Sequence, residues 1–322
     1  MPSLLGAIGD SYSQAYSVTP EYLRDHAQFS WVIGTAKNDG VYSLLERFRA
    51  LGGSPAVVDA ATSGRKMDDA PRQATAVAAA AGKLSPGQTA YVTFELGTND
   101  LCDYTQTDPT AFEANLRSAI SILRAGLPPG SRILMMSVPD FGHFRDITQA
   151  DPKAVAALAA LSLKLQPCPP FLGDKGTVTV AQAETYLSLY DASLAKVCDE
   201  IAVTDGATGK LYCTSSESLL SLRDFTISDL STVDYFHPSL GGQARMADAA
   251  WSADAWKALP LPSGAAAASA AEGIVAAVPT APAAAPALAW IWPTAARRRR
   301  RSHLRAHHEP RGRIAARSSL RP

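Results

Sequence analysis

The feature that most constrains the fold is an alternation of two hydrophobic patterns between residues 4 and 256. Short continuous apolar runs, each suited to a strand buried on both faces, are separated by segments with helical spacing. The runs are Leu4–Ile8, Ala56–Ala61, Ala90–Leu96 and Ile133–Val138, with a weaker fifth at Lys210–Thr214. Strands and helices that alternate in this way predict an α/β domain, in which helices cover both faces of a parallel sheet.

The segments between these runs carry apolar residues at i, i+3, i+4 and i+7, which line one face of a helix. The stripes are Val41–Phe48, Phe112–Leu127 and Ala183–Ile201, and a last helix is expected over Gly241–Trp256. Proline and glycine mark several of the ends: Asp108-Pro109 precedes the second stripe, and Pro128-Pro129 follows it.

The composition changes after Pro262. Residues 263–289 are nearly all alanine, proline and other small residues, which cannot build a packed core, and the run Arg297–Arg301 follows. Residues 264–322 hold ten arginines and two acids, a net charge of +8, whereas the 20 basic and 28 acidic residues before them give −8. We therefore expect one domain over residues 1–260 and a disordered tail over residues 261–322.

Three expectations concern partners. A cationic tail can contact an anionic surface. For the acidic domain no nucleic-acid partner is expected, and we expect a monomer. Nothing in the domain resembles an apolar stretch of about 20 residues that would span a membrane.

Four cysteines, Cys102, Cys168, Cys198 and Cys213, bear on the compartment. They form no CxxC pair, so no zinc site is expected. Two disulfides would indicate an oxidising compartment and a secreted or cell-surface protein. Four buried free thiols in a cytoplasmic protein are the alternative, and the first residues favour it, because they lack the basic and apolar regions of a signal peptide.

Four polar segments follow the predicted strands or precede the last helix. Ligands of parallel sheets bind beyond the carboxyl ends of the strands, so residues that follow different strands can meet there. Each segment alone is as typical of a turn or a helix cap as of an active site. The segments are GDS (9–11), SG (63–64), GTND (97–100) and DYFHP (234–238).

A nucleophilic serine needs a base within hydrogen-bond reach, and the base needs an anion that holds its tautomer. His237 has Asp234 three residues before it, so Nδ1 can meet the carboxylate while Nε2 faces Ser11. His143 is the runner-up base, and His26, among polar residues, is expected at the surface or beside substrate. The chain has no nucleophile-elbow GxSxG, HExxH or Walker motif, so we expect a serine mechanism with no metal and no cofactor.

In this order and at these distances, the four segments resemble the marker blocks of the SGNH (GDSL-type) serine hydrolases, a family of esterases and lipases. The Ser, Gly, Asn and His of its name correspond to Ser11, Gly64, Asn99 and His237. The resemblance implies a three-layer α/β/α, flavodoxin-like sandwich with a five-stranded parallel sheet. It also implies Asp234 as the acid of the triad, and an oxyanion hole formed by the Ser11 and Gly64 N–H groups and the Asn99 side chain.

A narrower resemblance is to phospholipase B-like bacterial members, carried by Phe29–Gly34 and Leu96–Cys102. Cys102 and Cys168 also match cysteines of that branch, although Thr98 stands where it commonly has glycine. The resemblance implies hydrolysis of lipid or short-to-medium acyl esters, with lysophospholipids among the candidates. The alternatives are an acyltransferase or thioesterase of the same fold, a catalytically silent surface-binding module, and a flavodoxin-like cofactor carrier.

Four further residues lie close to these segments. Asp10 and Asp100 flank the expected centre, and we expect them to hold its loops through backbone hydrogen bonds. Glu95 is unusual in a buried strand and must have a polar partner. Trp31 is expected either in an acyl pocket or in the core.

Overall fold

The structure of the chain is a computed structural model that describes residues 1–21, 23–103, 107–162, 168–172, 180–216 and 225–253. All of these residues fall within one compact unit, Met1–Gly273. The expected tail over residues 261–322, and the boundary before it, lie outside the described residues.

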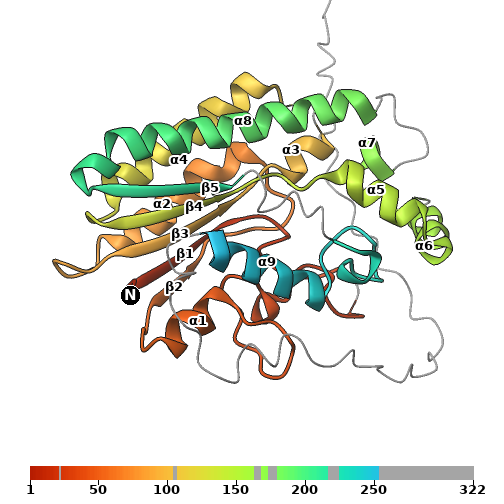
Figure 1. The fold of residues 1–322 in the computed structure, drawn as a ribbon, viewed down its shortest axis with the longest axis horizontal. Coiled ribbons are helices and arrows are strands. Elements are labelled where there is room, and N and C mark those ends of the chain that lie inside the picture. Colours follow the sequence, from red (N-terminus) through yellow and green to blue (C-terminus); the bar gives the residue numbers. More distant parts are fainter. Residues whose placement is uncertain (22, 104–106, 163–167, 173–179, 217–224, 254–322) are drawn as a thin grey trace, which may run out of the picture. The chain divides into compact units, whose positions relative to one another are not determined.

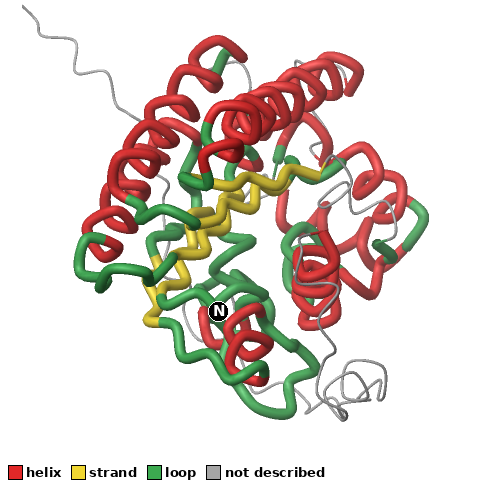
Figure 2. The backbone as a smooth tube through the Cα atoms, turned by 60° about the vertical axis from the view of Figure 1, so that its left-hand side comes forward, coloured by secondary structure: helices red, strands yellow, loops and turns green. Residues whose placement is uncertain are grey.

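A sheet of five parallel strands forms the centre of this unit (Figures 1 and 2). The strands are β1 (Leu4–Gly9), β2 (Ala56–Asp59), β3 (Ala90–Glu95), β4 (Ser131–Met136) and β5 (Leu211–Ser216). Their order is β2-β1-β3-β4-β5. Successive strands are added on one side of β1 as far as β2, and on its other side from β3 to β5. The strand order therefore reverses between the neighbours β1 and β3, which is the switch point of the sheet. The predicted α/β sandwich with a five-stranded parallel sheet is confirmed.

The edge strand β2 departs from the prediction of a buried run. Ala56, Val57 and Asp59 are exposed, Val57 by 39%. The physical reason is its position, since β2 is the outer strand of the sheet that the described residues form and pairs there with β1. The strands β1 and β3, in contrast, are buried along their whole length.

Helices cover both faces of the sheet (Figure 1). On one face lie α2 (Ala70–Ala81), α4 (Pro109–Gly126) and α8 (Val180–Thr204), which pack against one another in that order. On the other face lie α1 (Leu44–Ala50) and α9 (Leu240–Ala253). This arrangement confirms the three layers.

Local sequence accounts for the start of α4, which was predicted. The Asp108 carboxylate accepts hydrogen bonds from the N–H groups of Thr110 and Ala111 at 2.7 and 3.0 Å, and so caps α4, with Pro109 in its first turn. Four further helices and four 3₁₀ turns complete the described fold. They are α3 (Thr98–Cys102), α5 (Phe141–Gln149), α6 (Pro152–Ser162), α7 (Pro169–Leu172), η1 (Ala27–Phe29), η2 (Met67–Asp69), η3 (Gly206–Thr208) and η4 (Ile227–Asp229).

The cysteines form two disulfides, so the free-thiol alternative is wrong. Cys102–Cys168 joins the end of α3 to the residue before α7, and Cys198–Cys213 joins α8 to β5. Such bonds persist in oxidising compartments. Over the described ranges, no helix has the length and apolar character that crossing a membrane requires.

Candidate active site

The turn that carries Ser11 begins where β1 ends at the switch point. Gly9 has no room for a side chain, because a Cβ there would lie 2.2 Å from the Oγ atom of Ser13. After it, the Asp10 carboxylate accepts the Tyr12 N–H at 3.0 Å across Ser11. This hydrogen bond closes the turn, and it fixes the direction of the serine side chain.

A second turn, before α9, presents His237. Two backbone hydrogen bonds of 2.7 Å close this turn. They run from Ser231 N–H to the His237 carbonyl and from Tyr235 N–H to the Ser231 carbonyl. Tyr235 has a φ of +49°, a conformation that a non-glycine residue rarely adopts. The Asp234 carboxylate compensates by accepting the N–H groups of Phe236 and His237 at 3.0 and 2.9 Å through Oδ1.

The two turns bring three side chains into a chain of hydrogen bonds. His237 Nδ1 lies 2.8 Å from Asp234 Oδ2, and His237 Nε2 lies 2.9 Å from Ser11 Oγ. All three residues are largely buried, with the imidazole 12% exposed. A hydroxyl, an imidazole and a carboxylate in this order can move a proton from the hydroxyl to the ring and stabilise the imidazolium that results.

The electrostatics keep Asp234 ionised. Burial alone would raise the pKa of this carboxyl, but the charge of His237 and the hydrogen bonds to His237 and Phe236 outweigh burial and leave the pKa below its ordinary value. The carboxylate is therefore charged at neutral pH, as an anion that orients an imidazole must be.

Three aromatic rings surround the imidazole and were not predicted. The ring centroids of Tyr16, Phe236 and Tyr12 lie 4.8, 4.9 and 5.7 Å from that of His237. The Tyr12 hydroxyl also donates to the Phe236 carbonyl at 2.9 Å, so the first turn holds the second in place. The signal in the sequence was the pair of tyrosines one and five residues after Ser11.

The two remaining marker segments meet the Ser11 turn at the same edge of the sheet. The Asn99 amide Nδ2 donates to Asp10 Oδ2 at 2.9 Å and to the Arg65 carbonyl at 3.0 Å. Gly64, directly before Arg65, has a φ of +78°, which favours glycine at this turn. All four segments that the sequence singled out therefore converge, and both hydrogens of the Asn99 amide already have acceptors.

The two aspartates that flank the centre hold its loops as predicted. Asp10 accepts from Tyr12 and Asn99, and Asp100 Oδ2 accepts the Met67 N–H at 2.8 Å. Burial is the largest influence on both: it raises the pKa of Asp10 to about 6 and that of Asp100 to about 7.

Three other candidates lie elsewhere. His143 Nε2 hydrogen-bonds the Phe225 carbonyl at 2.9 Å, so this ring is engaged away from Ser11. His26 is only 4% exposed and pairs with the Thr19 hydroxyl at 3.0 Å, so its prediction as a surface residue is wrong. Trp31 is fully buried in the hydrophobic core, which favours the core interpretation.

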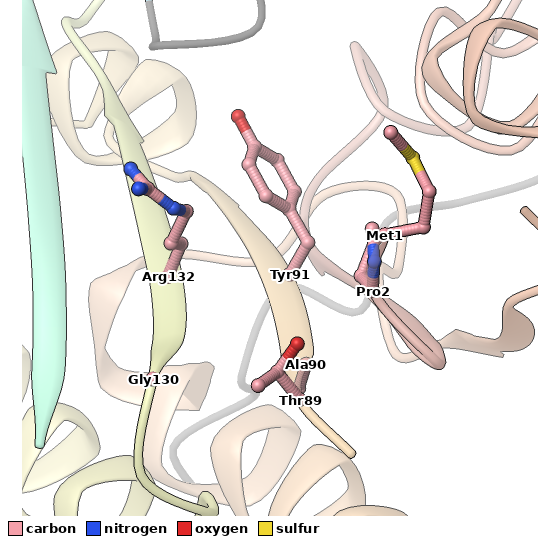
Figure 3. Close-up of a pocket in the computed structure, with 7 residues that line it drawn as sticks. All are labelled: Met1, Pro2, Thr89, Ala90, Tyr91, Gly130 and Arg132. Atoms are coloured by element: carbon pink, nitrogen blue, oxygen red, sulfur yellow. The ribbon is translucent and has the colours of Figure 1, made fainter. Parts of the chain in front are cut away.

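A pocket at the opposite end of the sheet has no part in this site. It lies at the amino ends of β3 and β4 (Figure 3). Ser11 and Asn99, in contrast, follow the carboxyl ends of β1 and β3. The residues that line it are Met1, Pro2, Thr89, Ala90, Tyr91, Gly130 and Arg132. Among the residues that the structure describes, no three His, Cys, Asp or Glu side chains are grouped to hold a metal ion.

Comparison with known proteins decides the family. Residues 7–245 match the model of the GDSL-like lipase/acylhydrolase family. The chain belongs to this family. The resemblance to GDSL-type hydrolases is thereby confirmed, and membership supports ester hydrolysis as the general activity. The narrower likeness to phospholipase B-like members stays a prediction.

Three solved structures align with most of this GDSL-family chain. TesA is 19% identical over 77% of this chain and 96% of its own, with a TM-score of 0.43. The esterase EstA from Pseudoalteromonas is 16% identical over 78% and 96%, with a TM-score of 0.41. The aryl esterase of M. smegmatis is 14% identical over 77% and 95%, with a TM-score of 0.44. No curated protein matches the chain.

Proposed function

We propose that the protein hydrolyses carboxylic esters through an acyl-enzyme on Ser11, with His237 as the base and Asp234 as the residue that orients it. The observation that supports this most strongly is the continuous chain of hydrogen bonds from the Ser11 hydroxyl through the imidazole to the carboxylate, at 2.9 and 2.8 Å. A serine is a weak nucleophile unless an adjacent base takes its proton, and this geometry provides that base.

The reaction has two halves. As Ser11 Oγ attacks the carbonyl carbon, its proton passes to His237 Nε2, and Asp234 stabilises the imidazolium. His237 then returns this proton to the leaving alcohol, and the carbonyl re-forms as an ester with Ser11. In the second half, water gives a proton to the same nitrogen, attacks the acyl carbon and releases the acid, and the serine recovers its hydrogen.

The negative oxygen of each tetrahedral intermediate needs hydrogen-bond donors. We assign the N–H groups of Ser11 and Gly64 and the Asn99 amide to this role. Because Asn99 Nδ2 already donates to Asp10 and to the Arg65 carbonyl, the oxyanion must share or replace one of these acceptors. None of these steps uses a cofactor or a metal.

For the substrate, we propose esters of short-to-medium acyl chains or lipids, with lysophospholipids included. We also propose that the protein acts as a monomer. Its proposed location is extracellular or at the cell surface, and the two disulfides support this location. Contact between the cationic tail and an anionic surface is a proposal from the sequence alone.

The test is the initial burst of p-nitrophenol from p-nitrophenyl butyrate. The wild type should release about one equivalent before the steady state, and Ser11→Ala should abolish it. Ser17→Ala is the matched control. Ser17 lies six residues after Ser11 and is buried, and its hydroxyl has no partner in the described part of the chain. An undiminished burst in Ser11→Ala would refute the mechanism. Products formed with added alcohols, and a panel including lysophosphatidylcholine, separate hydrolysis from acyl transfer and define the substrate.

A further inference from the structure

Glu95 is a buried acid next to the proposed nucleophile that the mechanism above does not use. It ends the central strand β3 and is only 1% exposed. Its strand pairs with β1 in register, so that Glu95 lies opposite Gly9, two residues before Ser11. A carboxyl group in such a place is costly to bury unless its hydrogen bonds repay the cost, so its contacts need an explanation.

This carboxyl contacts the turn that carries Ser11 in two places. Glu95 Oε2 accepts the Ser13 hydroxyl at 2.9 Å and faces the Asp10 N–H at 3.5 Å. One of these donors lies one residue before Ser11, and the other lies two residues after it. The carboxyl therefore contacts the turn on both sides of Ser11 and joins this turn to strand β3.

Asp10 is a second carboxyl in the same small space, and two negative charges there would repel each other. Asp10 accepts the Tyr12 N–H and the Asn99 amide, at 3.0 and 2.9 Å, and the charge of His237 also favours its ionised form. Burial and the charge of Asp10 raise the pKa of Glu95 well above its ordinary value. Of the two carboxyls, Glu95 is therefore the one whose neutral form is favoured, although the hydrogen bonds from Ser13 and Asp10 lower its pKa in part.

We propose that Glu95 is a positioning residue whose carboxyl group holds the turn from Gly9 to Ser13, so that Ser11 faces His237 and Asp10 faces Asn99. This inference rests on the proposed function of Ser11. It assigns to Glu95 no contact with the substrate. It predicts that the uncharged state and the length of the side chain matter for turnover.

The inference gives a pH dependence with a defined sign. The titratable groups that act on Glu95 are Asp10 and Tyr12, both on the turn that carries Ser11. These two groups in turn feel His237 and Asp234 on the turn before α9. When the pH rises far enough to ionise Glu95, a second negative charge appears beside Asp10 and loosens the turn. Turnover of the wild type should therefore fall on the alkaline side, and a neutral side chain of equal length should remove this fall.

Three variants test the role through kcat and KM for p-nitrophenyl butyrate. Glu95→Ala should lower kcat roughly 10- to 100-fold with little change in KM, because a misplaced nucleophile slows the reaction without weakening binding. Glu95→Gln should restore most of this kcat and flatten the alkaline fall. Ser13→Ala removes the partner hydroxyl, so its loss should be smaller and should add nothing to that of Glu95→Ala.

Asp205→Asn is the control for the pH profile, since Asp205 is a buried carboxyl that pairs with Arg124 instead of the site. It should leave the alkaline fall in place. Thermal melting shows that each variant is folded; should Glu95→Ala not fold, Glu95→Gln and Ser13→Ala still decide. Wild-type kcat in Glu95→Ala, an alkaline fall unchanged in Glu95→Gln, or no loss in Ser13→Ala would overturn the inference. Failure of the proposed function is distinct, because the wild-type burst would then survive in Ser11→Ala.

Discussion

Replacement of Asp234 by asparagine should exchange the protonated and unprotonated nitrogens of His237. The aspartate receives the Phe236 and His237 N–H groups on Oδ1 and the imidazole Nδ1–H on Oδ2. An asparagine has one oxygen, which remains with the two backbone donors, so its NH₂ group faces Nδ1. Two donors cannot bond each other. Nδ1 must therefore become the acceptor, and Nε2 carries the proton toward Ser11.

This change leaves the packing intact and removes the base. In a triad of this geometry, the wrong tautomer lowers kcat about 10⁴-fold, which corresponds to about 5.5 kcal/mol in the activation free energy. The effect on stability has its own pH signature. Because the folded-state pKa of Asp234 is lowered, its charge stabilises the fold above the unfolded pKa of about 4, and this contribution is lost as the pH falls through the folded value. The melting temperatures of wild type and Asp234→Asn should therefore converge in acid.

The assay is steady-state hydrolysis of p-nitrophenyl butyrate at pH 7, with thermal melting from pH 3 to 8. Asp229→Asn serves as the control, because Asp229 is a buried carboxylate in the same region that accepts hydrogen bonds from Thr226 and Arg245. It should keep most of the wild-type kcat. If folded Asp234→Asn retained kcat within about tenfold of the wild type, the assignment of Asp234 would be wrong.

Three other changes have defined outcomes. Asn99→Ala should lower kcat roughly 10²–10³-fold by removing an oxyanion donor, and a kcat equal to the wild type would exclude the amide from that role. Replacing Cys198 and Cys213 by serine should lower the free energy of unfolding by about 3 kcal/mol, measured by urea titration, since the bond closes a loop with a sequence separation of 15. Arg47→Ala should lower the free energy of unfolding by roughly 3 kcal/mol in the same titration, because a buried guanidinium with its ring contacts is lost. Asp248→Asn changes the half-exposed partner of Arg47 and should lower it by about 1 kcal/mol. Equal losses in the two variants would contradict this account.

The sheet and the convergence of the site could be predicted because both depend on local patterns. Continuous apolar runs located all five strands to within two residues. Once the strands are parallel, the residues after their carboxyl ends must share an edge. The spacing of three residues between Asp234 and His237 suffices for one turn to join their side chains. These inferences need no knowledge of how distant segments pack.

The features that escaped prediction have either a weak local signal or a cause in tertiary packing. Helix α2 buries Ala70, Ala74 and Ala81, and alanine gives too weak a hydrophobic contrast to reveal a helical face. The exposure of β2 follows from its place at the sheet edge, which strand order alone determines. The burial of His26 and the partners of Glu95 come from residues distant in sequence or from irregular turns, which periodicity does not report.

The most direct test of the central claim is the position of the covalent bond that a fluorophosphonate forms with the protein. Such reagents label serines that an adjacent base has activated. Peptide mass spectrometry should place the adduct on Ser11 alone, and labelling should disappear in Ser11→Ala while its melting temperature stays near that of the wild type. An adduct on another serine, or undiminished labelling of folded Ser11→Ala, would contradict the account.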